Sequence, residues 1–327
     1  MKNKSVLITG GAGFIGSHLI DLLDKDNIEY KVLDNLSTGS TENIPTAISK
    51  NCFIQGDVKN YSLLEELIKS ASSVVHMACN VGVKNVLANP LETIETNINS
   101  LKHIAYYCSV NKIPLVFFST SLVYSSFVEK KVLFSEEEQI HGLGFHPVSI
   151  YVSSKKMGEL ICEYYREQMG LKYIIVRPFN MIGIRQQSES GMVVPSFIRS
   201  ALKYKTINVF GSGNQTRSFS DVKTAVKLLW DIIRKANFYG QIFNLATTEK
   251  SIPIIELAKM IMEILNEPIK INFISISQVY GDSYRDVEFR SPSLAKLKQH
   301  ISGWEDRDLK EILKEIIEYE RQMDNLN

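Results

Sequence analysis

The chain has 327 residues, 44% of them hydrophobic, and its 37 Lys and Arg against 36 Asp and Glu give a formal net charge of +1. This length allows one large or two moderate globular domains. The balanced charge excludes the basic footprint of a nucleic-acid-binding protein, so an anionic ligand must be held by a local cluster of side chains.

The four cysteines, Cys52, Cys79, Cys108 and Cys162, are scattered without a C-x-x-C pair. We therefore expect no metal site, no disulfide framework and a reducing compartment. The first residues lead directly into an apolar run without a signal-peptide core, and no stretch of about 18 apolar residues occurs. These features predict a cytoplasmic protein that binds neither membrane nor nucleic acid.

The first predicted elements are a strand at Val6–Ile8, a glycine-rich turn and a helix. Glycines let the backbone approach a pyrophosphate closely, and a helix N-terminus offers free N–H groups and partial positive charge. Strand, turn and helix together predict a dinucleotide site. The residues of this G-x-x-G-x-x-G turn and of the first helical turn are Gly10, Gly13, Phe14, Ile15 and Gly16.

The second predicted strand, Lys31–Leu33, ends at Asp34, 18 residues beyond Gly16. A carboxylate about 20 residues from the glycine turn binds the adenosine ribose hydroxyls. It also repels a 2′-phosphate, so NAD and not NADP is the predicted cofactor. The alternative interpretation of Asp34 is an exposed aspartate at a strand end.

The chain continues with alternating strands and helices. Strands are predicted at Cys52–Ile54, Ser73–Met77, Leu115–Phe118 and Tyr173–Val176, and helices around Leu63–Ile68, Pro90–Val110 and Ile150–Met169. This alternation predicts an α/β fold with a doubly wound, Rossmann-type parallel sheet. The strand Leu115–Phe118 has no polar alternation, as is typical of a strand buried on both faces.

We assign residues 1–178 to the NAD-binding domain, with segments around 210–245 returning to it. After Arg177 the chain is richer in glycine-containing loops, and helices are predicted at Pro195–Lys203, Asp221–Lys235, Ile254–Leu265 and Leu309–Gln322. We expect residues 179–327 to form a smaller C-terminal α/β lobe. Since ligands of open α/β sheets bind beyond the carboxyl ends of the strands, this lobe is expected to bind the substrate.

Tyr151 and Lys155 lie early in the long predicted helix, one turn apart on the same face. A nearby ammonium lowers the pKa of a tyrosine, which can then act as a general base near neutral pH. Thr120 and Ser121 follow the buried strand Leu115–Phe118, where hydroxyls can reach the ligand and relay a proton to Tyr151. Taken alone, Tyr151 and Lys155 could also be ordinary residues of a helix surface. The hydroxyl residues after the strand could likewise belong to an ordinary polar turn.

In this order, the motifs resemble those of an extended short-chain dehydrogenase/reductase of the nucleotide-sugar epimerase/dehydratase branch. The resemblance covers nearly the whole chain. The matching segments are Thr9–Gly16, Asp34–Gly39, Gly56–Val58, His76–Ala78, Val81–Val83, Thr96–Asn97, Ser119–Tyr124, Tyr151–Lys155, Arg177–Asn180, Gly191–Pro195, Gly213–Phe219, and Tyr280–Gly281 through Arg290–Pro292.

The resemblance implies roles for individual residues. Tyr151, Lys155 and Thr120 would be catalytic. The cofactor contacts would be Gly10, Gly13, Phe14, Ile15, Gly16, Asp34, Asn35, Ser37, Thr38, Gly39, Asp57, Val58, Met77, Ala78, Asn97, Tyr151 and Lys155. The substrate contacts would be Val83, Thr120, Ser121, Asn180, Val194, Arg217 and Arg290. Arginines bind a diphosphate bidentately, and the alternative for each is a surface ion pair.

The resemblance further implies a UDP-sugar substrate that is oxidised at C4 to a transient 4-keto sugar. In this family, dehydratases carry Asp-Glu directly after the catalytic Thr, and related decarboxylases carry Glu two positions after it. Here Ser121 and Leu122 occupy these positions, so the acid/base group of the usual elimination is missing. We therefore expect an NAD-dependent UDP-sugar 4-epimerase.

Two alternatives stay open. The departures from the family pattern are Ser125 and Ser126 after Tyr124, Ile184 within Gly183-Ile184-Arg185, and Ser218 in place of a common aspartate. With Cys79 or Lys84 as a different acid/base group, the chain would be an atypical dehydratase or decarboxylase. The other alternative is a redox sensor or scaffold without catalysis, which the intact Thr120, Tyr151 and Lys155 disfavour.

The resemblance also implies a homodimer, because family members pair two helices across a two-fold axis into a four-helix bundle. The predicted helices Pro90–Val110 and Ile150–Met169 carry apolar residues on more than one face. These residues include Tyr106, Tyr107, Ile161, Tyr164 and Tyr165. The alternative is that they pack on the sheet of their own chain.

Overall fold

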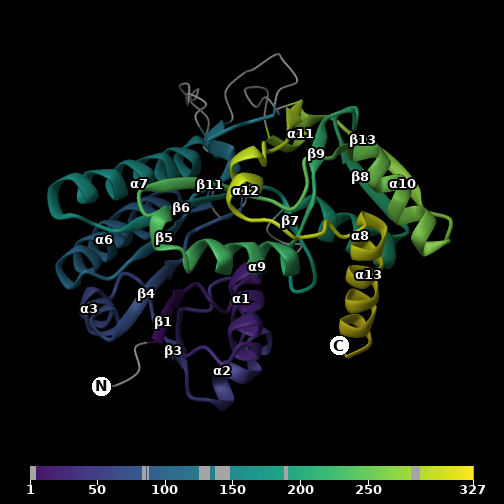
Figure 1. Cartoon of the computed structure of the whole chain (residues 1–327). Coiled ribbons are helices and arrows are strands. Elements are labelled where there is room, and N and C mark those ends of the chain that lie inside the picture. Colours follow the sequence, from purple (N-terminus) through teal and green to yellow (C-terminus); the bar gives the residue numbers. More distant parts are fainter. Residues whose placement is uncertain are drawn as a thin grey trace. The chain divides into compact units, whose positions relative to one another are not determined.

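The computed structural model describes residues 5–82, 86, 88–124, 133–136, 148–187, 191–280 and 288–326 (Figure 1). The chain divides into two compact units. Unit 1 comprises Met1–Val123, Pro147–Pro178 and Val226–Leu245, and unit 2 comprises Tyr124–His146, Phe179–Ala225 and Ala246–Asn327.

Unit 1 contains a seven-stranded sheet in the order β11-β6-β5-β4-β1-β2-β3. Its strands are β1 (Ser5–Thr9), β2 (Tyr30–Asp34), β3 (Phe53–Gln55), β4 (Ala71–His76), β5 (Leu115–Phe118), β6 (Tyr173–Pro178) and β11 (Gln241–Leu245). All neighbouring strands are parallel, which confirms the predicted Rossmann-type sheet. The sequence predicted no strand at β11, because Gln241 and Asn244 interrupt its apolar pattern.

Helices cover both faces of this sheet (Figure 1). On one face lie α1 (Phe14–Lys25) and α2 (Pro45–Ser49), and on the other α3 (Tyr61–Lys69), α6 (Ser100–Asn111) and α7 (Val148–Met169). The second face buries a continuous apolar core that includes Leu101, Phe117 and Ile175. The packing of α7 against β5 therefore belongs to the best-buried part of unit 1.

The predicted helix Pro90–Val110 is helical throughout but not uniform. It consists of α5 (Pro90–Ile94), a π-helical turn η2 (Glu95–Asn99) and α6. A π-helical turn inserts extra backbone into a helix and is frequent at functional sites. Here it carries Asn97, a predicted cofactor contact.

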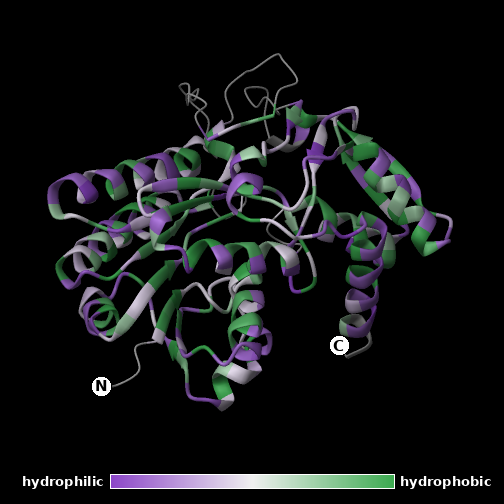
Figure 2. Cartoon of the chain, viewed as in Figure 1, coloured by the Kyte–Doolittle hydropathy of each residue, from purple (hydrophilic) through white to green (hydrophobic). Residues whose placement is uncertain are grey.

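Unit 2 contains three small sheets among its described residues. They pair β7 (Met181–Ile182) with β10 (Ser220–Asp221), β8 (Thr206–Phe210) with β13 (Lys270–Ile274), and β9 (Thr216–Ser218) with both β12 (Ser251–Pro253) and β14 (Phe289–Arg290). The helices α8 (Val193–Tyr204), α10 (Ile254–Leu265) and α13 (Leu309–Leu326) bury their apolar faces in the core of this unit. Figure 2 shows the hydrophobic and hydrophilic faces of α10 and α13. The helix α9 (Val222–Ile233) begins in unit 2 and continues into unit 1, and the short helices α11 (Ile276–Tyr280) and α12 (Ala295–His300) belong to unit 2.

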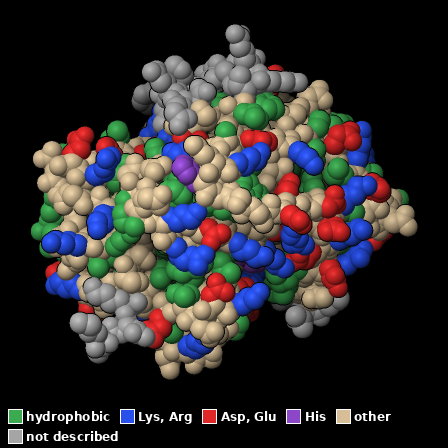
Figure 3. All heavy atoms as spheres, in the orientation of Figure 1, with side chains coloured by type: hydrophobic (Ala, Val, Ile, Leu, Met, Phe, Trp, Pro, Cys, Tyr) green, Lys and Arg blue, Asp and Glu red, His purple; other side chains and the backbone are tan. Residues whose placement is uncertain are grey.

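Basic and acidic side chains are interspersed over the face drawn in Figure 3, in agreement with the formal net charge of +1. Within the described ranges, no helix combines the length and the apolar character needed to cross a membrane.

Gly158 lets α7 pack closely on the sheet. A Cβ at this position would lie 2.4 Å from Cζ of Phe117 and 2.9 Å from Cδ2 of Leu101. Because both side chains are buried, we expect Gly158→Ala to lower the free energy of unfolding by about 1–3 kcal/mol, measured by urea denaturation. Ser153→Ala, at an exposed position of the same helix, serves as the control. Equal stability of the two variants would contradict this packing.

Candidate active site

The glycine-rich turn after β1 packs backbone directly against backbone. Gly10 has φ +74°, and a Cβ there would lie 2.6 Å from the amide nitrogen of Ala78. A Cβ on Gly16 would lie 2.6 Å from the carbonyl oxygen of Gly10. No side chain caps α1 at Gly13, so the first N–H groups of this helix are available to phosphate oxygens. The turn therefore fits the pyrophosphate of a dinucleotide.

The carboxylate of Asp34 is fixed at the end of β2. Its Oδ2 accepts a hydrogen bond of 2.9 Å from the backbone N–H of Ala12, and its Oδ1 one of 2.8 Å from that of Leu36. Burial raises the pKa of Asp34, although both amide bonds act in the opposite sense. The carbonyl of Ala12 accepts in turn from Ser40 N and Asn43 Nδ2. The loop after β2 is thereby tied to the glycine turn.

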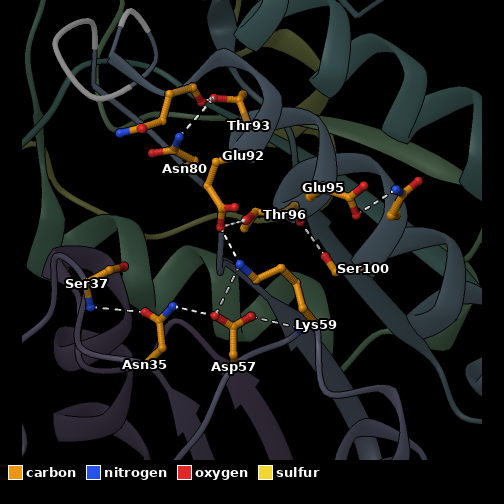
Figure 4. Close-up of polar contacts among 12 residues, drawn as sticks. Asn35, Ser37, Asp57, Lys59, Asn80, Glu92, Thr93, Glu95, Thr96 and Ser100 are labelled. Carbon is orange, nitrogen blue, oxygen red and sulfur yellow. Dashed lines mark hydrogen bonds and ion pairs between the residues drawn. The ribbon is translucent and has the colours of Figure 1, made fainter.

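The predicted cofactor contacts Asn35, Ser37 and Asp57 lie side by side (Figure 4). Asn35 Nδ2 donates to Asp57 Oδ2 at 2.9 Å, and Ser37 N donates to Asn35 Oδ1 at 3.0 Å. Asp57 Oδ1 accepts from the backbone N–H of Lys59, whose ammonium pairs with Glu92 at 2.5 Å. The loops after β2 and β3 and the start of α5 therefore form one connected rim. The other predicted contacts of this rim are Thr38, Gly39 and the buried Val58.

The three predicted catalytic residues meet where β5 ends and α7 begins. Thr120 hydrogen-bonds the phenol of Tyr151, which is 8% exposed, and accepts the N–H of Leu122 at 3.2 Å. Lys155 is buried, and its Nζ donates to the carbonyl oxygen of Phe118 at 2.7 Å. The predicted substrate contact Ser121 follows directly and is also buried.

The electrostatics of Tyr151 are set mainly by its burial. Burial raises the pKa of Tyr151 far above its usual range and the neighbouring Cys79 raises it further, while the hydrogen bond from Thr120 lowers it. The ammonium of Lys155 donates to the Phe118 carbonyl, since a buried ammonium needs an acceptor, and its lowering of the Tyr151 pKa stays a prediction. NAD supplies a positively charged nicotinamide ring when bound, and such a charge favours the phenolate.

Asn97 has internal partners in the structure. Its amide accepts from the N–H of Asn80 at 2.8 Å and donates to Ser154 Oγ at 3.0 Å. Ser154 Oγ donates in turn to the carbonyl of Tyr151 at 2.7 Å. The π-helical turn thus links the segment after β4, which contains the predicted contacts Met77 and Ala78, to the first turns of α7. The role of Asn97 as a cofactor contact stays a prediction.

Two buried features of the site carry no role in the sequence interpretation. His76 Nδ1 lies 2.7 Å from Thr9 Oγ1, and burial, together with the charge of Lys155, lowers the pKa of His76 to about 3. Glu159 pairs with Arg177 at 2.7 Å in the interior of unit 1. The spacing Tyr151, Lys155, Glu159 is the signal that could have identified the carboxylate, since i, i+4 and i+8 share one helix face.

Two of the predicted substrate contacts in unit 2 lie side by side. Arg217 on β9 and Arg290 on β14 are direct partners in a parallel register, so their side chains leave the same face of the sheet. Arg290 Nη2 donates to Asn180 Oδ1 at 3.1 Å, and Asn180 Nδ2 donates to the carbonyl of Ser218 at 2.8 Å. Two adjacent guanidiniums with an amide form a donor set that suits a diphosphate.

The other two predicted substrate contacts contribute less. Val194 is fully buried in the core of unit 2, so only its backbone, in the first turn of α8, is available to a ligand. Val83 lies outside the described residues.

Comparisons with known proteins give the family of the chain. The NAD dependent epimerase/dehydratase family model matches residues 6–246, and the chain belongs to this family. A UDP-N-acetyl-alpha-D-glucosaminuronate decarboxylase from Bacillus cytotoxicus is 32% identical over 326 residues, which cover 98% of this chain and 99% of that protein.

Two solved structures are similar over nearly their whole length. The UDP-N-acetylglucosamine 4-epimerase from Methanobrevibacter ruminantium M1, in complex with UDP-N-acetylmuramic acid, has a TM-score of 0.85 and 28% identity and covers 99% of this chain and 100% of its own. The UDP-glucuronic acid 4-epimerase from Bacillus cereus, in complex with UDP-glucuronic acid and NAD, has a TM-score of 0.84 and 25% identity, with coverage of 98% and 99%. The comparisons confirm the resemblance to nucleotide-sugar short-chain dehydrogenases/reductases and NAD as the cofactor.

The carboxylate of Asp34 gives a direct test of the cofactor site. We expect Asp34→Asn to weaken NAD binding by about 10- to 100-fold in isothermal titration calorimetry, because hydrogen bonds to a charged acceptor contribute about 1.5–3 kcal/mol. The discrimination against NADP should also decrease. Asp26→Asn, at an exposed position after α1, is the matched control and should bind NAD normally. Unchanged NAD affinity in Asp34→Asn would contradict the assignment.

Proposed function

We propose that the chain is an NAD-dependent UDP-sugar 4-epimerase that inverts C4 through a transient 4-keto sugar. The observation that supports it best is the hydrogen-bonded pair Thr120 and Tyr151, with the ammonium of Lys155 buried beside it. Ser121 and Leu122 follow Thr120, so these two positions bring no carboxylate for elimination or decarboxylation. Epimerisation at C4 needs only a base that removes and returns one proton.

The residues of unit 1 would perform this proton transfer. As a phenolate, Tyr151 takes the proton of the sugar 4-hydroxyl, and Thr120 holds the same oxygen by its hydroxyl. When bound, NAD would supply the acceptor and donor of the C4 hydride, which must leave one face of the sugar and return to the opposite face for C4 to be inverted. Tyr151 then returns the proton to the C4 oxygen, which restores the phenolate for the next cycle. Lys155 holds positive charge near the phenolate and offers donors to the nicotinamide ribose.

The residues of unit 2 would bind the nucleotide diphosphate. Arg217 and Arg290 emerge in register from one sheet, and Asn180 orients the guanidinium of Arg290. A diphosphate carries two negative charges, which matches two guanidiniums in number and geometry. This arrangement anchors the part of the substrate that does not react.

An atypical decarboxylase or dehydratase is the second candidate. It is favoured by the similarity to the Bacillus cytotoxicus decarboxylase over nearly the whole chain. Cys79, close enough to Tyr151 to raise its pKa, would be the acid/base group in that case. Both candidates share the 4-keto sugar and differ in what happens to it.

A panel of UDP-sugars distinguishes the candidates. We expect NMR to show C4 inversion for at least one UDP-sugar, and the panel should include the uronic acids. A new double bond would indicate the dehydratase, and a lost carbon the decarboxylase.

Tyr151→Phe should lower turnover by about 10²- to 10⁴-fold while NAD stays bound, because only the proton transfer is removed. Turnover at the wild-type rate would contradict the role of Tyr151.

We further propose that the chain forms a homodimer through α6 and α7. Of the five apolar residues named from the sequence, Tyr107, Ile161 and Tyr165 pack against the core of unit 1. By contrast, Tyr106 and Tyr164 are 45% and 59% exposed. The exposed face of these helices also contains Val110, Met157 and Leu160. A continuous apolar surface of this kind is typical of a two-fold interface.

Leu160 is 64% exposed at the middle of this face, and its replacement tests the homodimer. We expect light scattering of the wild type at micromolar concentration to give twice the mass of one chain. Leu160→Glu should give the mass of one chain, because a buried unpaired carboxylate opposes association. Glu167→Gln, at an exposed polar position of α7, is the control and should leave the mass unchanged. A wild type of single-chain mass would refute the homodimer.

A further inference from the structure

We propose that Ser119, Glu159 and Arg177 form a positioning unit that holds Thr120 in hydrogen-bonding contact with Tyr151. This inference rests on the proposed function only in taking Thr120 and Tyr151 as the reacting pair. All five residues belong to unit 1.

The geometry of α7 is the first argument. Tyr151, Lys155 and Glu159 lie on one face of the helix, in three successive turns. Each contacts one of three consecutive residues at the end of β5: Tyr151 contacts residue 120, Lys155 the carbonyl of residue 118, and Glu159 residue 119. The helix α7 therefore contacts each of the residues 118, 119 and 120 after or at the end of β5, and Thr120 is the last of these three.

The second argument is the saturation of the Glu159 carboxylate. Arg177 donates to it twice, from Nε to Oε1 at 2.9 Å and from Nη2 to Oε2 at 2.7 Å. The hydroxyl of Ser119 donates to Oε1 at 2.5 Å. The guanidinium comes from β6, the neighbour of β5 in the sheet, so the carboxylate joins two strands to the helix.

The third argument is the burial of the Glu159–Arg177 ion pair, which costs the hydration of two charges. The side chains of Arg177 and Glu159 are 3% and 9% exposed. A buried ion pair often stabilises a fold no better than apolar residues of similar size, but its geometry is strict. The main chain adds to the constraint, because Ser119 N donates to the Val176 carbonyl at 2.9 Å. Ser119 is thus held by both its backbone and its side chain, and little freedom is left to Thr120.

The consequence concerns the proton affinity of Tyr151. Burial and Cys79, from the segment after β4, raise the pKa of Tyr151, and Thr120, from the segment after β5, lowers it. Lys155 is the cationic group on the same helix face. If Ser119 loses its contact with Glu159, Thr120 gains freedom and its hydrogen bond to Tyr151 weakens. The phenolate then forms at a higher pH.

The test is a pH titration of tyrosinate absorbance on NAD-loaded protein, with Tyr151→Phe subtracted to isolate Tyr151. We expect Ser119→Ala to raise the Tyr151 midpoint by about 0.5–1 pH unit, the size of one lost hydrogen bond. Below the midpoint, turnover should fall by about three- to tenfold in parallel, with the KM little changed. Glu159→Gln should shift the midpoint in the same direction if it folds, although Arg177 then lacks its counter-charge.

Two controls separate position from stability. Ser109→Ala removes another buried hydroxyl of unit 1, which donates to Ala105 O at 2.7 Å, and should leave the midpoint unchanged. Glu320→Gln weakens the ion pair with Arg199 in unit 2 and should lower stability only. An unchanged midpoint in Ser119→Ala, or a wild-type Tyr151 that does not titrate before unfolding, would overturn the inference. Because the titration needs no sugar, it is decided independently of the UDP-sugar panel.

Discussion

The burial of the central strands on both faces is the constraint from which the site follows. Every residue of β1 and β5 is buried, and the side chains from Val6 to Ile8 and from Leu115 to Phe118 are all apolar. Several buried polar groups of unit 1 lie where the strands end at their carboxyl edge. Thr9, His76 and Thr120 all stand there, and so does Asp34 at the end of β2. Parallel strands place these ends at the same edge of the sheet, which concentrates the chemistry.

A charged group in such an interior needs a hydrogen-bond partner or a counter-charge, and each charged group of unit 1 described here finds a different one. Lys155 is satisfied by a strand-end carbonyl, Glu159 and Arg177 neutralise each other, and His76 avoids the problem by staying neutral. Tyr151 is the exception, because its surroundings raise its pKa and keep it protonated. A group that resists ionisation until a cation arrives is suited to act only on the loaded enzyme. In the proposed function, this arrangement would link cofactor binding to the formation of the Tyr151 phenolate.

The two units contribute different kinds of recognition. In the proposed function, unit 1 would bind the phosphates and hydroxyls of the cofactor through backbone N–H groups and fixed carboxylates. Unit 2 uses two guanidiniums in strand register, which suit an anionic substrate. In the proposed function, the outcome of the common 4-keto sugar would depend on the side chains near it. The mixture of epimerases and a decarboxylase among similar proteins agrees with this view.

Local patterns in the sequence determined much of the fold. The strand Leu115–Phe118 and the helix Ile254–Leu265 were predicted with the bounds that the structure has, because an unbroken apolar run and a regular apolar face are local signals. The glycine turn and the Tyr151–Lys155 spacing are local in the same way. By contrast, β11 carries too few apolar residues to be recognised, and it forms because an edge of the sheet is open beside β6.

Only the tertiary structure decided the partners of the buried polar groups. No spacing in the chain indicates that Lys155 would turn to the carbonyl of Phe118, or that Ser119 and Arg177 would meet at Glu159. Nor does it show that Arg217 and Arg290, 73 positions apart, would become neighbours in register. Secondary structure follows from periodicity along the chain, whereas a buried polar contact depends on which donors and acceptors the packed elements bring within about 3 Å of one another.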